Sequence, residues 1–330
     1  MGKRRHIKFY KYYKEWVETY KVGQIADVTL DKYWLVAKQL KKYVPDLDLG
    51  DMTRFDVQHL INEYGKTHEL PTVRDFLHHI EAPLRDAVYE GWIPKDPTYK
   101  VNATSQVQHK STRVKYLEPD QIRRLENVLK SKDDVTTIMF DFDLRTGLRF
   151  AELLGLTPKD VDLKKLTIYV NKSWNYKEKV GHFAPTKNKY SNRVLKIDWQ
   201  AMTDLQKVLP GCPEDEPIFV KALSNEYAKL EDSPRRIPEK SKYYRIYNST
   251  LNLRLASLCK EAEVPRITIH SLRHTHASML ISAGVSIQSV AKRLGHGNTQ
   301  TTQNTYIHLL DDLAIKDDNK MLTVLSSLGA

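Results

Sequence analysis

The sequence feature that most limits the fold is a three- and four-residue spacing of apolar side chains that recurs through the first hundred residues. It runs through four segments, residues 8–21, 29–44, 53–66 and 72–92. This spacing gathers apolar side chains on one face of an α-helix. Gly65 and Gly91 stand near the ends of the last two segments, as glycine often does where a helix ends. We therefore predict a small all-helical domain over residues 1–100.

The periodicity stops after Trp92. Residues 93–115 contain two prolines and no acidic residue after Asp96. Proline and the loss of apolar spacing indicate a segment without regular structure. We predict an interdomain linker over residues 101–115. Its basic character suits a strap along a phosphate backbone, although short linkers are also lysine-rich for solubility alone.

Helical spacing returns in the rest of the chain. Helices are expected over residues 118–130 and 135–145, and again from Tyr243 onward. Two stretches have the composition of strands and flank a polar hairpin region, residues 166–171 and 192–197. Over residues 116–330 we predict a mostly helical domain with one small antiparallel sheet. The fold class is therefore mainly α.

The composition argues against a membrane-spanning or disulfide-stabilised chain. Hydrophobic residues make up 41% and the mean hydropathy is -0.54. No apolar run approaches the roughly 20 residues that a membrane span needs, and no apolar segment follows the basic start, so we expect no signal peptide. Cys212 and Cys259 lie far apart, which fits a reducing compartment. We expect a cytoplasmic protein.

The charge favours an anionic partner. The net charge is +11, and residues 1–43 carry eleven Lys and Arg against four Asp and Glu. Nucleic acid is the first candidate for such a chain. Aromatic side chains are interleaved with these charges, which also fits amphipathic helices with aromatics inward and lysines in water. Both interpretations can hold together.

Residues 270–284, HSLRHTHASMLISAG, crowd three histidines and an arginine into seven positions. His270 and His274 are four residues apart and share a helix face, as in a zinc-binding HExxH helix, but Ser271 stands where that motif requires Glu. We therefore expect no metal. Arg273 would also put a permanent cation beside the ion.

The same segment has a core-facing interpretation. We expect one apolar stripe of the helix to face the core, with His276 as a buried structural histidine, and it comprises Leu272, His276, Met279, Leu280 and Ala283. His270 and Arg273 lie about 60° apart on a different face. Their side chains are therefore available to a ligand.

Two other signals do not lead to a site. Gly65-Lys66-Thr67 resembles the end of a phosphate-binding loop, but Leu60 replaces the glycine required five positions earlier. Asp141 and Asp143 resemble a nuclease metal pair, but residues two apart on a helix diverge. We interpret both aspartates as surface or capping acids.

Four further motifs occur in a fixed order. TGLRFAELLGL contains Arg149, FAPTKNKYSNRVLKI contains Lys187, HSLRH contains His270 and Arg273, and RLGHGNTQTTQNTYIHL contains His296 and Tyr306. With these motifs, nearly the whole chain resembles the tyrosine recombinases, also called the phage integrase family. Each motif alone is weak, but the set in this order is specific.

The resemblance implies a fold, a reaction and residue roles. It implies a SAM-like core-binding domain before the catalytic domain, and cleavage and rejoining of DNA through a 3′-phosphotyrosyl intermediate without metal, ATP or other cofactor. Tyr306 would be the nucleophile. The other roles fall to Arg149 and Arg273 as phosphate-binding guanidiniums, His270 as a base, His296 as a second phosphate contact, Lys187 as the acid for the 5′ oxygen and Glu152 as the residue that orients Arg149. Lys172 and Lys189 lie close to Lys187 and compete for its role.

The resemblance also implies partners. We expect double-stranded DNA attachment or core sites, a homotetramer on two such sites, and room for an accessory DNA-bending or excision factor, in association with the nucleoid. The expected DNA contacts outside the site are Lys3, Arg4, Arg5, Lys110, Arg113 and Lys115. The apolar tail over residues 319–330 is expected to pack on a neighbouring protomer or in cis.

Two alternatives stay open at the level of the sequence. Helices of core-binding type begin by about residue 8, so an arm-binding module is expected to be absent, and a chromosome or plasmid dimer resolvase of the Xer type is then a simpler role. Residues 286–310 also read as a helix–turn–helix, which would fit a non-catalytic DNA-binding regulator. That regulator would leave Arg149, Lys187 and the His270–Arg273 pair unexplained.

Overall fold

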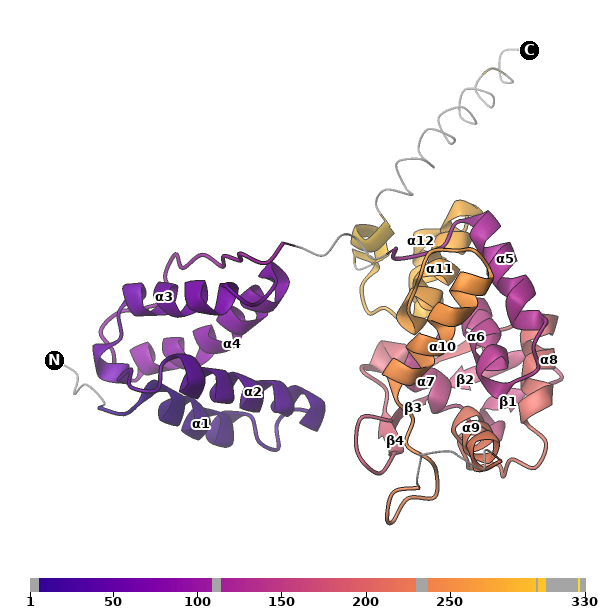
Figure 1. Ribbon diagram of the computed structural model, residues 1–330, viewed down its shortest axis with the longest axis horizontal. Helices are drawn as coiled ribbons and strands as arrows, with labels where there is room; N and C mark the ends of the chain where they lie inside the picture. Colours follow the sequence, from indigo (N-terminus) through magenta and orange to yellow (C-terminus); the bar gives the residue numbers. More distant parts are fainter. Residues whose placement is uncertain (1–5, 109–113, 230–236, 301, 307–325, 327–330) are drawn as a thin grey trace. The chain divides into compact units, whose positions relative to one another are not determined.

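The computed structural model describes residues 6–108, 114–229, 237–300, 302–306 and 326 (Figure 1). It divides into two compact units, residues 1–112 and 113–330. No helix among the described residues is both long enough and apolar enough to cross a membrane. The mainly helical fold class with a small antiparallel sheet is confirmed.

The described part of the N-terminal unit, residues 6–108, contains four α-helices and a short 3-10 helix. These are α1 (Phe9–Tyr20), α2 (Asp27–Tyr43), η1 (Leu49–Asp51), α3 (Arg54–Gly65) and α4 (Leu70–Tyr89). Their apolar faces meet in one core that includes Phe9, Tyr13, Leu40, Ile61 and Ile80. Each helix covers most of a segment in which the apolar spacing predicted one.

The first part of the expected linker packs on α3. Gln58 on α3 donates to the carbonyl of Asn102 at 2.9 Å, and Gln106 N donates to the carbonyl of Gly65 at 3.0 Å. A Cβ on Gly65 would lie 2.1 Å from the carbonyl oxygen of Thr104, so only glycine allows this approach. The N-terminal unit therefore continues beyond residue 100.

The C-terminal unit is built around α6. The α-helices described in full are α5 (Pro119–Lys130), α6 (Val135–Thr146), α7 (Phe150–Leu154), α8 (Trp199–Val208), α9 (Ile218–Ala228), α10 (Asn248–Glu261), α11 (Ile269–Ser282) and α12 (Ile287–Leu294), and residues 302–306 are also helical. The helices with the most contact to α6 are α5, α8, α9 and α11. Almost every side chain of α6 is consequently buried.

Two small sheets complete this unit. The first is antiparallel in the order β1 (Val161–Asp162), β2 (Thr167–Val170), β5 (Arg193–Lys196), with Ile168 opposite Leu195. The predicted strand pair is therefore confirmed. A second hairpin, β3 (Lys172–Asn175) with β4 (His182–Pro185), occupies the polar region between them. Four of its eight strand residues are polar and only Trp174 is buried, so no apolar alternation marked its strands in the sequence.

Two sequence-based expectations are wrong. Asp141 and Asp143 are not surface acids, since they are 3% and 1% exposed. Other helices pack on several sides of α6, so two side chains that point in different directions from it are both buried. The α11 stripe is narrower than expected, because Met279 and Ala283 are exposed. His276 is buried as predicted, with Nδ1 donating to the carbonyl of Leu144 at 2.9 Å.

Candidate active site

All six residues expected to be catalytic line one cavity of the C-terminal unit, with a volume of about 410 Å³. Its wall comprises Arg149, Lys187, Asn188, His270, Arg273, His274, Leu294, His296, Gly297, Thr305 and Tyr306. These residues come from segments up to 157 positions apart in the sequence. The fold thus gathers side chains that only motif order had connected.

Arg149 enters the cavity from a tight turn between α6 and α7. Gly147 ends α6 with φ +64, and a Cβ there would lie 2.5 Å from the ring of His276, so glycine is required. The guanidinium of Arg149 is then held by three partners. Nη1 donates to Glu152 Oε1 at 2.6 Å and to Ser191 Oγ at 3.1 Å, and Nη2 donates to the carbonyl of Gly295 at 3.0 Å.

Glu152 is the buried carboxylate behind this arginine, 4% exposed. It also accepts from Nη2 of Arg193 at 3.1 Å. Burial raises the pKa of Glu152, but the charges of Arg193, Arg149 and Arg273 outweigh it, so the net shift of the pKa is downward. The carboxylate is therefore ionised at neutral pH and can hold two guanidiniums in place.

Arg193 was missed by the sequence analysis. It lies on β5 on the same side as Leu195, and it is 9% exposed. In the predicted strand, inward-facing and outward-facing residues alternate, and this places Arg193 on the inward face. A buried arginine needs a buried partner, so this alternation could have indicated its role. Arg193 Nε also donates to the carbonyl of Arg293 at 2.6 Å, which ties β5 to α12.

Arg273 lies one helical turn into α11 and is 3% exposed. Nη1 donates to the carbonyl of Gly147 at 2.7 Å and Nη2 to the carbonyl of Leu294 at 2.6 Å. Burial, followed by the charge of Arg149, lowers the pKa of Arg273 to about 9. The guanidinium therefore remains cationic at neutral pH.

His296 follows Gly295, the left-handed cap of α12 with φ +68. Its Nε2 lies 3.1 Å from Nη2 of Arg273, and its Nδ1 lies 2.8 Å from Oγ1 of Thr302. Since arginine can only donate, Nε2 accepts and Nδ1 carries the proton of the neutral ring. Burial and then Arg273 lower the pKa of His296 to about 4, in agreement with a neutral imidazole.

Tyr306 closes the cavity, and its ring is 2% exposed. Its hydroxyl lies 2.8 Å from Nδ1 of His274. The ring of His270 packs edge-to-face on His274, with centroids 4.7 Å apart. Burial raises the pKa of Tyr306, and the charge of Arg273 only partly opposes this shift. The phenol is therefore protonated at rest.

His274 is the second residue to which the sequence analysis gave no role. Burial, followed by His270, Arg273 and Lys115, lowers its pKa to about 4. The signal for it was the four-residue spacing from His270, which places both rings on one face of α11. That spacing was weighed only as a metal motif.

Lys187 is exposed in the loop after β4 and lines the cavity. Among the described residues its ammonium group has no hydrogen-bond or ion-pair partner. The two competing lysines have other partners. Lys172 forms an ion pair with Asp160, and Nζ of Lys189 lies 5.3 Å from the ring centroid of Tyr190. Neither lines the cavity, so the geometry favours Lys187 of the three.

Of the six residues expected to contact DNA, the structure describes only one. Lys115 is exposed and lines a neighbouring cavity of about 530 Å³ together with Arg266, His270 and His274. The other five lie outside the described residues, namely Lys3, Arg4, Arg5, Lys110 and Arg113. The apolar tail, apart from Ser326, also lies outside them.

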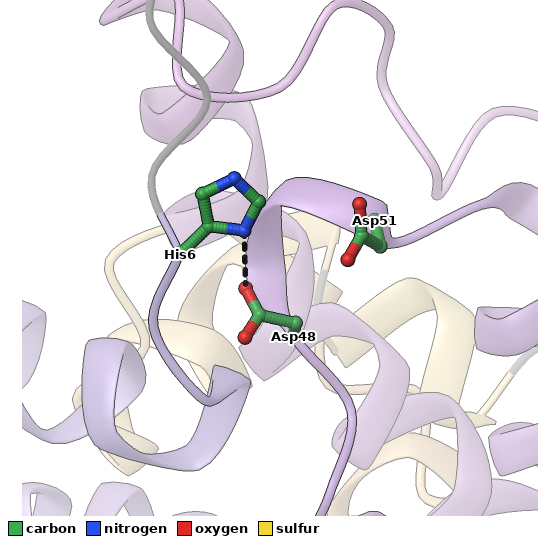
Figure 2. Close-up of side chains that lie close together, drawn as sticks. All are labelled: His6, Asp48 and Asp51. Atoms are coloured by element: carbon green, nitrogen blue, oxygen red, sulfur yellow. Dashed lines mark ion pairs between the residues drawn. The ribbon is translucent and has the colours of Figure 1, made fainter.

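One group of potential metal ligands occurs among the described residues, and it is far in sequence from the residues that line the cavity. His6, Asp48 and Asp51 in the N-terminal unit have ligand atoms within 4.8 Å of one another (Figure 2). His6 Nδ1 lies 3.9 Å from Asp48 Oδ1, and both His6 and Asp51 are exposed. None of the residues expected to be catalytic belongs to this group.

A helical unit in which a buried guanidinium, a second, half-buried one and a tyrosine share one cavity defines a class, the site-specific tyrosine recombinases. Residues 115–312 match the phage integrase family. The integrase of Staphylococcus phage L54a is 24% identical over 339 residues, covering 96% of this chain and 92% of that protein. The chain belongs to the phage integrase family.

Solved structures agree with this fold. The Tn1549 transposon integrase in complex with transposon right end DNA superposes with a TM-score of 0.70 at 17% identity, covering 96% of this chain and 100% of that one. A lambda integrase tetramer bound to a Holliday junction has a TM-score of 0.60 at 18% identity, covering 89% and 78%. The alternative of a non-catalytic helix–turn–helix regulator is wrong, because the family match covers a recombinase catalytic domain.

Proposed function

We propose that this protein integrates and excises a phage or other mobile element by cutting and rejoining DNA through a covalent bond between Tyr306 and a 3′ phosphate. The observation that carries the proposal is the convergence of Arg149, Arg273 and Tyr306 on one cavity. The likeness to a phage integrase and to a transposon integrase bound to transposon DNA supports the mobile-element role.

The two guanidiniums supply the electrostatic part of the reaction. A phosphodiester resists attack because its oxygens repel a nucleophile, and the transition state gathers further negative charge. Arg149 and Arg273 offer charged, forked donors to the two non-bridging oxygens. Each such donor, fixed in advance, contributes roughly 10²- to 10³-fold to the rate. A metal ion is not needed for this role.

The proton transfers complete the step. Tyr306 Oη forms a bond to phosphorus while the bond from phosphorus to the 5′ oxygen breaks. The phenol proton passes to one of the α11 histidines that line the cavity, and Lys187 donates a proton to the departing 5′ oxygen. His296 assists Arg273 at a non-bridging oxygen. The phosphotyrosyl bond keeps the energy of the phosphodiester, so a 5′ hydroxyl of another strand can reverse the step without ATP.

The remaining parts of the chain provide DNA binding. We expect residues 1–100 and 116–330 to grip one DNA site, with residues 101–115 as the strap between them, and Lys3, Arg4, Arg5, Lys110, Arg113 and Lys115 as phosphate contacts. Affinity should then fall steeply with salt, because each neutralised phosphate releases counterions. The lambda integrase tetramer supports a homotetramer on two sites for this chain as well. The place of action is the cytoplasm, on nucleoid DNA.

A nicked duplex tests the proposal. Cleavage next to the nick releases a short fragment, so religation fails and the covalent complex accumulates. The native protein should form this complex in the presence of a chelator, and Tyr306→Phe should form none while binding the same DNA. If Tyr306→Phe still forms the complex, the assignment of the nucleophile is wrong. Recombination between chromosomal dimer sites instead of element ends would favour the Xer-type alternative.

A further inference from the structure

We infer that His274, rather than His270, accepts the proton of Tyr306 during cleavage. The inference rests on the proposed function, since it assigns a role within that reaction. Nδ1 of His274 lies 2.8 Å from the Tyr306 hydroxyl. Among the described residues no other group forms a hydrogen bond with this hydroxyl, and the ring of His270 packs on the ring of His274 without such a bond to Tyr306.

The protonation states at rest are those that a base requires. The pKa of the phenol is raised and that of His274 is lowered, so the proton lies on the tyrosine. Tyr306 therefore donates to Nδ1, and Nε2 carries the proton of the neutral imidazole. The charged and titratable groups that face His274 are His270 and Arg273 on α11, Lys115 on the segment before α5, His296 after α12, and Tyr306 itself. They keep the ring unprotonated and ready to accept.

The arrival of DNA changes the balance in favour of transfer. A phosphodiester held by Arg149 and Arg273 brings negative charge into the cavity, which stabilises an imidazolium nearby. As the bond from Oη to phosphorus forms, the oxygen loses its affinity for the proton. The proton can then move the short distance to Nδ1 in the transition state. Without a phosphate the proton transfer is unfavourable, so the tyrosine stays protonated and is a weak nucleophile.

His270 has a different part in this arrangement. Its ring stands at 86° to that of His274 and lines the same two cavities. It limits the orientations of His274 and leaves its own nitrogens free of the tyrosine. In this scheme His270 positions the base and contacts the phosphate. Its loss should therefore not change how the rate depends on the acidity of the phenol.

Asparagine provides a matched pair of variants. In His274→Asn the side-chain oxygen can occupy the place of Nδ1 and accept the hydrogen bond, but it cannot take the proton. We expect single-turnover formation of the covalent complex to slow by about 10²-fold or more, the usual size of a general-base contribution, while DNA affinity stays within about threefold. His270→Asn is the control at the neighbouring ring.

The decisive readout is rescue by a more acidic nucleophile. Fluorotyrosine incorporated at position 306 needs less help from a base. It should restore a large part of the rate of His274→Asn and little of the rate of His270→Asn. A substrate with sulfur in place of the bridging 5′ oxygen needs no acid, so it should rescue Lys187→Ala and not His274→Asn.

Three results would overturn the inference. The first is a cleavage rate of His274→Asn within threefold of native, and the second is rescue by fluorotyrosine of His270→Asn alone. The third is faster cleavage by His274→Asn, which would mean that His274 restrains the tyrosine. Failure of the proposed function is distinguishable, because the native protein would then form no complex or Tyr306→Phe would still form one.

Discussion

The two sides of the cavity are built differently. On the arginine side, Arg149 and Arg273 are held by carbonyl groups and by the buried Glu152, and Arg273 is 3% exposed. On the lysine side, Lys187 is exposed and without a polar partner among the described residues. One side is fixed before DNA arrives, and the other is free to adjust.

This difference follows from what each side does. Donors that stabilise developing charge act best when they need no reorganisation during the reaction, so burial and multiple hydrogen bonds favour them. A proton donor must approach an oxygen that moves as its bond breaks, so a flexible exposed chain suits it. Variants on the arginine side should therefore affect both rate and stability, and those at Lys187 should affect only rate.

Arg273→Lys should have the largest effect. Lysine keeps the charge but loses the forked donors to the phosphate and to the carbonyls of Gly147 and Leu294, so the cleavage rate should fall by roughly 10³-fold or more. Single-turnover cleavage measures this. A methylphosphonate linkage, which lacks one charged oxygen, should be cleaved with a smaller difference between native and variant. An undiminished difference would mean that the arginine does not act on that oxygen.

Lys187→Ala comes next. Loss of the acid should slow cleavage by about 10²-fold, while the midpoint of thermal unfolding stays within about 1 °C because an exposed residue without contacts contributes little to stability. Lys189→Ala is the matched control, since that lysine is also exposed in the same loop but does not line the cavity. Equal falls in the cleavage rate of Lys187→Ala and Lys189→Ala would contradict the assignment of Lys187 as the acid.

Glu152→Gln should combine both effects. The variant leaves Arg149 and Arg193 without their shared carboxylate, so we expect roughly tenfold slower cleavage and a fall of about 3–5 kcal/mol in the free energy of unfolding, as for breaking a buried ion pair. Asp162→Asn is the control, because its ion pair with Lys165 is also i,i+3 but exposed, so its loss should change the free energy of unfolding far less. Denaturant titration compares them, and similar losses would contradict the buried role of Glu152.

Asp143→Asn should have the smallest effect on rate, within about threefold. Burial raises the pKa of Asp143 well above its usual value, and neither carboxyl oxygen has a hydrogen-bond partner among the described residues. The folded chain therefore keeps a proton that the unfolded chain releases above about pH 4, so the free energy of unfolding of the native protein falls as pH rises. Asparagine does not titrate, so the Asp143→Asn variant does not lose stability in this way as pH rises.

The variant should accordingly be more stable than the native protein at pH 8, and the difference in the free energy of unfolding should shrink towards pH 4. Denaturant titrations at several pH values measure it. A less stable variant at pH 8 would show instead that Asp143 is ionised and acts as a counter-ion to Arg273.

The sequence predicted those parts that local pattern determines. Apolar spacing located α1 to α6, and motif order identified six residues that line one cavity. Residues whose role depends on distant partners were not identified. Arg193 forms a hydrogen bond with Glu152, 41 positions away in the sequence, and His274 with Tyr306, 32 positions away.

The two buried aspartates show the same limit. A helical spacing tells which side chains share a face but not how many faces the rest of the fold will cover. Asp141 and Asp143 became buried because helices from four other parts of the chain surround α6. The strands β3 and β4 were not located within the expected polar hairpin region for the opposite reason, since a hairpin with one buried side chain has little apolar alternation to detect.

The central claim is that Tyr306 becomes covalently attached to DNA, and peptide mapping of the trapped complex tests it most directly. Trypsin should release residues 294–316, which contain a single tyrosine. After nuclease digestion, mass spectrometry should find a nucleotide on that peptide, with fragment ions that locate it at Tyr306. A nucleotide on any other peptide, or an unmodified 294–316 peptide from a complex that is fully covalent, would contradict the account.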